Sequence, residues 1–364
     1  MTEPSPEPPD VHLAAHASRS ASRLGASLGR TFNPLEWRRR GAIAGTASAL
    51  VALVIVIAVL GFWWSLEPDP FGVEQRAQAM AEANGQEIGT GYVTTATLIG
   101  VTDTLLHKPG GYLDERRAAP GVLMDNMPAW EFGVVVQVRD LARVLRNEIS
   151  RSQTQSREDE DLAHAEPQFN FDANSWLFPS TEGEYEEGLG RLRDYRDRLA
   201  AGDADFYARA DNLNAWLAVV GQRLGGIAQR LGASVGEWRV NTDLAGDRAA
   251  TQAQQHPARE VRAQTPWLEI DNEFYHARGA TWALLHFLQA TRVDFESVLA
   301  DKNAEASMAQ VIRALEATQR PMGSPIVLNG DGFGFFANHS LVMASYISRA
   351  NAGIIDLRRL LEQG

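Results

Sequence analysis

The sequence from Gly41 to Trp64 reads GAIAGTASALVALVIVIAVLGFWW, and the organisation of the rest of the chain follows from it. These 24 residues include no charged side chain and no proline. As a helix they are long enough to cross a bilayer core of roughly 30 Å. Lipid offers a backbone no hydrogen-bond partners, so such a span is stable only as a helix. The sequence therefore predicts one transmembrane helix at 41–64.

The flanks of this span predict its orientation. Residues 38–40 are three arginines, whereas Glu67, Asp69 and Glu74 follow the span. Under the positive-inside rule this places the N-terminus in the cytoplasm and the bulk of the chain in the periplasm, anchored in a bacterial inner membrane. A cleaved signal peptide is the alternative. Its apolar region is shorter, about 7 to 15 residues, and it ends in small residues rather than in two tryptophans.

Three small residues within the span recur at intervals of four: Gly41, Gly45 and Ala49. This spacing is typical of membrane helices that approach each other closely, so it marks a candidate homodimer face. Chance is the alternative interpretation, because small residues are common in membrane helices.

The charge and the cysteine content of the chain exclude some classes of partner and of site. The chain has 364 residues and a net charge of −12. Its first 40 residues carry six arginines against four acidic residues, so the part beyond the span has a net charge of about −14. A surface of that charge repels phosphate backbones, and we expect no nucleic-acid partner. The absence of cysteine excludes disulfides, thiol nucleophiles and thiolate metal sites. We expect no cofactor.

Apolar residues beyond the span recur with the period of a helix. One series runs from Phe206 to Leu231, another from Ile270 to Leu288 and a third from Met343 to Leu361. Together with shorter series, they predict an all-α protein in which a periplasmic bundle of about six to eight helices follows the transmembrane helix. The long polar stretch at 232–266 indicates a mobile loop or a linker. The expected division is a disordered cytoplasmic tail (1–40), the span (41–64), a helical subdomain (65–231), the loop (232–266) and a C-terminal helical subdomain packed on the first (267–364).

Two pairs of residues have the acid-x-x-His spacing of metal ligands on one helix face: Glu273 with His276, and Asp161 with His164. About one such pair is expected by chance among eight histidines and 46 acidic residues, so Glu273 and His276 are only weak metal candidates and no metal site is predicted. His286 lies among large apolar residues and is expected to be a buried core histidine.

Two connectors are candidate binding sites. The segment GSPIVLNGDGFGFFANHS, Gly323 to Ser340, combines glycines with aromatic and polar groups, whereas EPQFNFDANSWLF, 166–178, combines aromatic and polar groups. Alternatively, Asn338 or Ser340 only caps the last helix, and the second connector only closes the end of a bundle. The candidate binding-loop residues are Asp331, Phe333, Phe335, Asn338 and His339, and the candidate cleft residues are Asp172, Asn174 and Trp176.

Several phrases of the chain resemble a known family. They include WEFGVVVQVRDLAR, TPWLEIDNEFYHARG and NHSLVMASYISRANAGIIDLR. The chain is similar through them, from about residue 60 to its end, to proteobacterial envelope proteins catalogued as domain of unknown function two-three-three-three. The resemblance implies a single-span inner-membrane protein with no assigned reaction, and no catalytic residue is carried over.

The sequence thus favours a non-enzymatic, membrane-anchored module of the cell envelope. Its expected partners are the lipid bilayer and another envelope protein, with a homodimer as a further option. A periplasmic hydrolase or metal-binding enzyme that uses His339, or Glu273 and His276, is the alternative. A hydrolase would also need an orienting acid and an oxyanion hole, which the sequence does not reveal.

Overall fold

The computed structural model describes residues 34–114, 118–153, 156–236, 238–240, 260–262, 264–324, 326–331 and 334–363. Of residues 34–45 and of the two strands, only the backbone is described. Residues 1–33 of the expected tail lie outside the described residues. The same holds for Phe333 and for most of the loop expected at 232–266.

The chain divides into two compact units at the end of its first described helix. Helix α2, Pro34–Trp64, belongs almost wholly to the first unit, which ends at Trp63. Its segment Thr46–Trp64 is the one stretch among the described residues that is long and apolar enough for a membrane span, and none of it is buried. The second unit begins at Trp64 and contains everything that follows.

The second unit is built from helices, which confirms the all-α class. Ten α-helices are described beyond α2, more than the six to eight expected, because short helices join the long ones. The only described strands are β1 (Trp238–Val240) and β2 (Glu260–Arg262), which pair antiparallel with Trp238 opposite Arg262. The helices are α3 (Val73–Asn84), α4 (Tyr92–His107), α5 (Asn126–Val144), α6 (Glu160–Phe169), α7 (Thr181–Ala201), α8 (Ala210–Ser234), α10 (Ile270–Asp294), α11 (Glu296–Asp301), α12 (Glu305–Thr318) and α13 (His339–Glu362), with short turns η1 (Gly121–Leu123), η2 (Leu145–Ile149) and η3 (Trp267–Glu269).

The apolar series read from the sequence form the buried faces of these helices. In α8 the residues Leu213, Leu217, Val220, Leu224, Ile227 and Leu231 are all buried. The same holds in α13 for Met343, Ile347, Ala350, Ile354, Leu357 and Leu361. Capping follows the sequence signals as well. Ser180 accepts a hydrogen bond from the backbone N–H of Gly183 at the start of α7, and Asn338 accepts one from Leu341 at the start of α13.

Glycines allow two pairs of helices to pack closely together. A Cβ atom added to Gly279 of α10 would lie 1.9 Å from the carbonyl oxygen of Trp130 in α5, and one added to Gly133 of α5 would lie 2.3 Å from that of His276. The backbones of α5 and α10 are therefore in direct contact. On the other side, Gly221 of α8 faces Ile354 and Asn351 of α13, so these two helices also pack closely.

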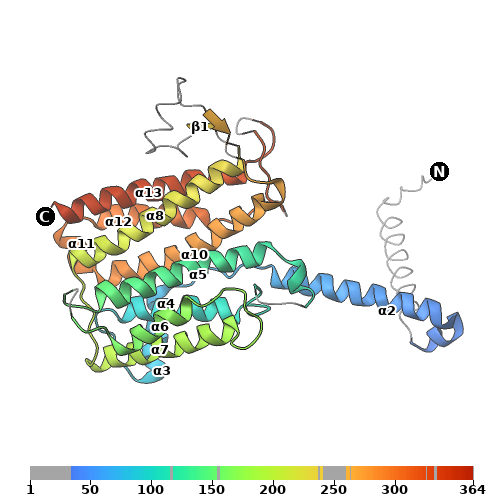
Figure 1. The fold of residues 1–364 in the computed structure, drawn as a ribbon, viewed down its shortest axis with the longest axis horizontal. Helices are drawn as coiled ribbons and strands as arrows, with labels where there is room; N and C mark the ends of the chain where they lie inside the picture. The colour runs from blue at the N-terminus through green and yellow to red at the C-terminus, as the bar shows by residue number, and fades with distance from the viewer. Residues whose placement is uncertain are drawn as a thin grey trace, which may run out of the picture. The chain divides into compact units, whose positions relative to one another are not determined.

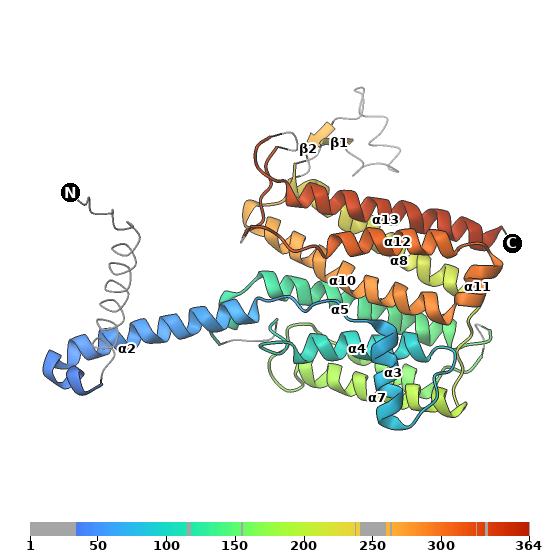
Figure 2. The same cartoon turned by 180° about the vertical axis from the view of Figure 1, so that it is seen from behind.

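Four connectors gather at one end of the second unit, which we call the loop end. They are residues 108–125, 170–180, 264–269 and 319–338, each located between consecutive helices or between β2 and α10. Figures 1 and 2 show α5, α10 and α13 all beginning at this end, so that α5 runs parallel to α10 and α8 antiparallel to α13. The Tyr112 hydroxyl donates to the Ala173 carbonyl oxygen at 2.8 Å, which ties the first connector to the second.

One core extends through the second unit on both sides of residues 232–266. The same buried cluster contains Val134 of α5, Leu189 of α7, Leu284 of α10 and Leu315 of α12. The division into two subdomains stays a prediction.

Candidate functional site

The predicted binding loop before α13 is held by its own polar groups. His339 accepts a hydrogen bond from the Leu328 N–H at Nδ1, 2.9 Å away, and its own N–H donates to the Leu328 carbonyl oxygen. The Asn338 amide donates to the Gly330 carbonyl oxygen at 2.6 Å. Both side chains thus shape the loop and begin α13. Asp331 and Asn338 line a hollow of about 660 Å³, whereas Phe335 is 98% exposed.

The predicted cleft residues before α7 lie on the surface. Asp172, Asn174 and Trp176 are all exposed. The Asp172 carboxylate accepts a hydrogen bond from the Asn174 N–H at 3.4 Å, and the Asp172 carbonyl oxygen accepts one from the Thr181 hydroxyl at 2.7 Å. These bonds close the connector onto the start of α7.

The weak metal candidates, Glu273 and His276, line a cleft on the second unit, but they have other partners there. Glu273 accepts a hydrogen bond from Nε of Arg230 at 2.9 Å. Burial lowers the pKa of His276 to about 4, and the positive charge of Arg230 acts in the same direction. Asp161 of the second pair bonds to Arg198. Within the described part of the chain, no group of three or more potential ligands could hold a metal ion.

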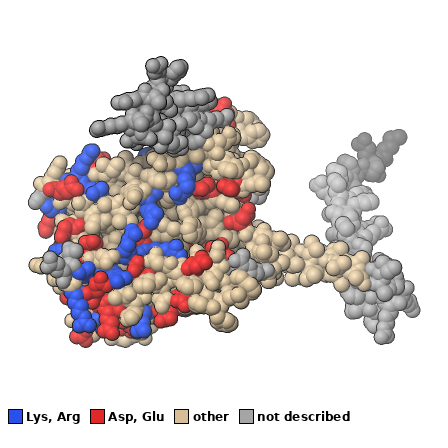
Figure 3. Space-filling model, viewed as in Figure 1, with Lys and Arg blue, Asp and Glu red and all other residues tan. Residues whose placement is uncertain are grey.

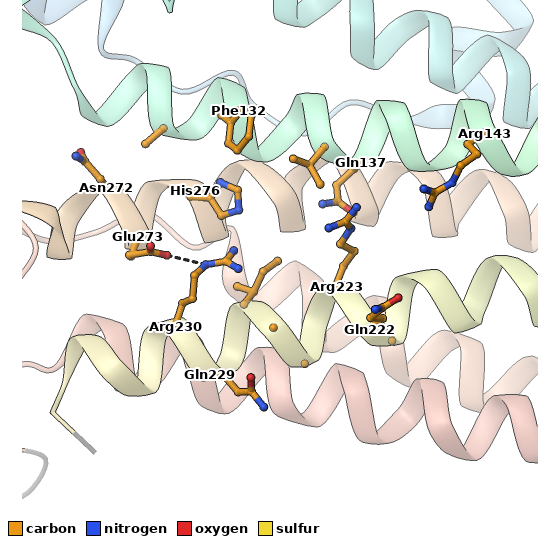
Figure 4. A pocket seen from close by; sticks show the side chains of 16 residues that line it. Phe132, Gln137, Arg143, Gln222, Arg223, Gln229, Arg230, Asn272, Glu273 and His276 are labelled. Atoms are coloured by element: carbon orange, nitrogen blue, oxygen red, sulfur yellow. Dashed lines mark hydrogen bonds and ion pairs between the residues drawn. The ribbon is translucent and has the colours of Figure 1, made fainter. Parts of the chain in front are cut away.

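This cleft lies between α5, α8 and α10 and has a volume of about 1030 Å³. Figure 4 shows side chains from all three helices directed into it: Phe132 and Gln137 from α5, Arg223 and Arg230 from α8, and Glu273 and His276 from α10. The cleft exists because α8 packs against α13 through Gly221 while α5 packs against α10 through Gly133. Those two close contacts leave space between α8 and α5.

Three arginines contribute positive charge to the lining of the cleft. Arg143, Arg223 and Arg230 all contribute. Arg223 donates to the carboxylate of Asp140 through Nε at 2.5 Å and Nη2 at 3.0 Å, and Arg143 donates to the same carboxylate at 2.9 Å. The bond to Asp140 raises the pKa of Arg223. Figure 3 shows Lys and Arg atoms gathered across the middle of this face, over α8 and α5.

Gln137 is the unusual member of the lining. Its side chain is buried, with 1% of the residue exposed, and its neighbours Val136 and Val138 in the chain are apolar. Neither its amide nitrogen nor its amide oxygen has a hydrogen-bond partner among the described residues. Buried polar groups are paired in the great majority of cases, so a side chain of this kind at the wall of a cleft indicates a binding site.

Comparison with known proteins identifies the family. The model of DUF2333, described as an uncharacterised protein conserved in bacteria, matches residues 37–364. The chain belongs to the DUF2333 family. This confirms the resemblance seen in the sequence, and the match begins at residue 37, before the apolar span. No curated protein and no solved structure matches this DUF2333 chain.

The candidate homodimer face of this DUF2333 protein stays a prediction. Gly41, Gly45 and Ala49 all lie within α2, and Ala49 is exposed. For Gly41 and Gly45 the structure describes only the helical backbone.

The cleft residues on α5 and α8 were missed in the sequence, although a signal was present. Arg223 and Arg230 are seven residues apart, which places them on one face of α8, beside its buried seam. Gln137 interrupts the apolar run VVVQV. Each signal is weak alone, because a polar helix face usually contacts only solvent. Only the packing of α8 opposite α5 brings them together.

Proposed function

We propose that this chain is a single-span protein of the bacterial inner membrane, with its N-terminus in the cytoplasm and its helical unit in the periplasm. There the helical unit acts as a non-enzymatic interaction module of the cell envelope. Support for the anchor comes from the length and apolar composition of Thr46–Trp64. Support for the orientation comes from the three arginines at 38–40 and the acidic residues that follow Trp64.

The observation that carries this proposal is the distribution of exposed apolar side chains over the second unit. Among the positions that the structure describes, the loop end exposes ten large apolar residues, drawn from all four connectors. The connectors at the opposite end, 85–91, 150–159, 202–209 and 302–304, expose one such residue among the described positions, Ile88. The ten are Val122, Leu123, Trp176, Leu177, Phe178, Trp267, Leu268, Ile326, Phe335 and Phe336.

Trp64, the first residue of the second unit, lies at this same end. Trp64, where α2 ends, packs against the core of the second unit. Its indole lies so close to Gly110, in the first connector, that a Cβ atom there would be 2.8 Å from the ring. Trp64, the residue that directly follows the first unit in the chain, therefore lies within the loop end.

Tryptophan and phenylalanine at such a position favour the boundary between lipid and water. Their rings bury apolar area there, and the indole N–H still reaches a polar partner. Ten apolar side chains exposed to water alone would instead be an aggregation hazard. The loop end thus fits a bilayer surface, which leaves the sides of the helical unit available to another envelope component.

The enzymatic alternative receives less support from the geometry. His339 uses Nδ1 to hold Leu328, and Glu273 is paired with Arg230. A binding role does not require the side chain of His339 or of Glu273 to be released from these partners. Stoichiometric metal in the purified full-length protein would favour the enzyme, whereas crosslinking in living cells that traps one defined envelope protein would favour the module.

The topology is tested with a reporter enzyme that is active only outside the cytoplasm, fused after Gly364. We expect activity. A matched fusion directly after Arg40, before the span, should be inactive. An inactive Gly364 fusion in cells that contain the intact fusion protein would refute the orientation. Release of the full-length chain from vesicles by alkaline carbonate would refute the anchor itself.

A further inference from the structure

The unpaired amide of Gln137 limits the chemistry of a ligand in the α5–α8–α10 cleft. Its nitrogen donates hydrogen bonds and its oxygen accepts them, and neither has a partner among the described residues. A phosphodiester offers only acceptors, so it would leave the Gln137 oxygen unsatisfied. One residue of an extended peptide offers its N–H and its C=O on the same side of the backbone, which supplies both the donor and the acceptor. The group opposite Gln137 is therefore best the backbone N–H and C=O of one extended residue.

The charges of the cleft favour a negative group on the same ligand. Three arginines, Arg143, Arg223 and Arg230, face two carboxylates, those of Asp140 and Glu273. His276 adds no charge at neutral pH, because burial and the neighbouring Arg230 lower its pKa to about 4. The cleft is thus positive by one charge in a chain whose net charge is −12.

Arg230 is the arginine best placed to hold a carboxylate. Only its Nε is paired among the described residues, with Glu273, so Nη1 and Nη2 can donate side by side to two carboxylate oxygens. Arg223 already uses Nε and Nη2 for Asp140. Figure 4 shows Arg230 and His276 at one position along the cleft and Gln137 with Arg223 at the next.

Between these two positions, the α8 side of the cleft leaves room for an extended backbone and the α5 side offers an apolar surface for side chains. Gly226 lies on α8 between Arg223 and Arg230, and a Cβ atom built on it would meet nothing closer than 3.9 Å, the end of the Arg230 side chain. A ligand backbone can therefore approach α8 at this point. Phe132 and Val136 of α5 form an apolar wall opposite, and Phe132 is 40% exposed.

We infer that the cleft binds a short peptide with a free C-terminal carboxylate. The carboxylate lies on Nη1 and Nη2 of Arg230, the backbone N–H and C=O of one peptide residue pair with the Gln137 amide, and an apolar side chain packs on Phe132. A volume of about 1030 Å³ accommodates a peptide of a few residues. This inference names a ligand for the proposed module, but it does not depend on the topology of the chain in the membrane.

The test uses the full-length protein in detergent micelles. It is incubated with a mixture of N-acetylated tripeptides, randomised at all positions and ending in free carboxylates, and the retained peptides are identified by mass spectrometry. A retained peptide is then resynthesised as acid and as carboxamide for calorimetry. We expect the acid to bind at least about tenfold more tightly, because charge-assisted bonds to the carboxylate are lost in the carboxamide. Retention of no peptide, or equal affinity of the two forms, would overturn the inference.

Two variants and a control assign the binding to this cleft. Arg230→Gln and Gln137→Leu should each weaken the binding of the retained peptide acid at least about tenfold. Gln137→Leu should also raise the melting temperature of the free protein by about 2 °C, because an unpaired buried amide is removed. Arg359→Gln, on the exposed face of α13, should change neither quantity. Parent-like binding by both cleft variants, or displacement of the peptide by an equal concentration of inorganic phosphate, would overturn the peptide assignment. The reporter fusion after Gly364 reads the topology independently of either result.

Discussion

His286 in α10 accepts a hydrogen bond at Nε2 from the backbone N–H of Phe71, 3.0 Å away and 215 residues earlier in the chain. The two rings are stacked, with centroids 4.0 Å apart. Nδ1 of His286 lies 2.7 Å from the carbonyl oxygen of Trp282, so the ring carries its proton there. This fastens the segment that follows Trp64 to the centre of the core, and it confirms the expectation that His286 is a buried core histidine.

Acid should weaken the fold through this histidine. Burial lowers the pKa of His286 to about 4, with a smaller contribution from Arg76 in the same direction, whereas the bond to Trp282 acts against both. The unfolded chain, with a pKa near 6.5, binds the proton more readily. The stabilisation is complete above pH 6.5 and is lost as the pH falls towards 4, by up to about 3 kcal/mol.

Urea unfolding of the parent and of His286→Gln at pH 7 and pH 4.5 measures this loss. The free energy of unfolding should fall less with acid in the variant than in the parent. His164→Gln, at an exposed position, is the matched control and should keep the parental pH dependence. An identical dependence in all three proteins would contradict the prediction.

The contact between α5 and α10 should tolerate no side chain at Gly279. An added Cβ atom would lie 1.9 Å from the Trp130 carbonyl oxygen, so the two helices must move apart. We expect Gly279→Ala to lower the free energy of unfolding by about 3 kcal/mol. Gly190→Ala in α7 is the control, because nothing lies within 4 Å of its new atom. It should raise the stability by roughly 0.5–1 kcal/mol through its helix propensity. Equal effects of the two substitutions in chemical denaturation would refute this packing.

A buried ion pair holds the first connector of the loop end. Lys108 pairs with Glu131 of α5, whose carboxylate also accepts hydrogen bonds from the N–H groups of Leu113 and Asp114. Burial raises the pKa of Glu131 to about 7, and Lys108 opposes this shift. Lys108→Met should therefore destabilise the protein by about 3–5 kcal/mol, since it leaves a buried carboxyl group without its cation.

The double variant Lys108→Met, Glu131→Gln provides the control for this pair. It should recover part of the lost stability, because the uncompensated charge is removed as well. Thermal unfolding of the parent, the single variant and the double variant measures the effect. If the double variant is less stable than Lys108→Met alone, the pairing does not act as described.

The proposed contact of the loop end with lipid can be measured by site-directed labelling. The chain contains no cysteine, so single cysteines introduced at Leu268, Phe335 or Ile88 can each carry a nitroxide without further changes. In the full-length protein reconstituted into vesicles, labels at Leu268 and Phe335 should collide more with oxygen, which is enriched in lipid, than with a water-soluble nickel chelate. The label at Ile88, at the opposite end, should show the reverse. The same accessibility at all three positions would contradict contact of the loop end with the bilayer.

Local patterns in the sequence were sufficient for the helices and their ends. The buried seam of α8 from Leu213 to Leu231 has the helical period, and Asn338 lies where a cap for α13 was expected. Helical period and capping depend on residues within about one turn of each other, so they are readable without the fold.

The cleft could not be predicted from local patterns of this kind. Gln137, Arg230 and His276 come from three helices, and only His276 was singled out in the sequence, for a different reason. The separation of α8 from α5 depends on Gly221 against α13 and on Gly133 against α10. A glycine in a helix carries no local sign of which partner it will approach.

The sequence by itself determined that this is an all-α chain with one apolar helix before it, because helical period and apolar length are local properties. The tertiary structure alone decided that four connectors with exposed aromatic residues meet at the end where Trp64 lies, and that a buried glutamine faces three arginines. Both depend on which helices pack together, which is set by contacts between residues that are far apart in the chain.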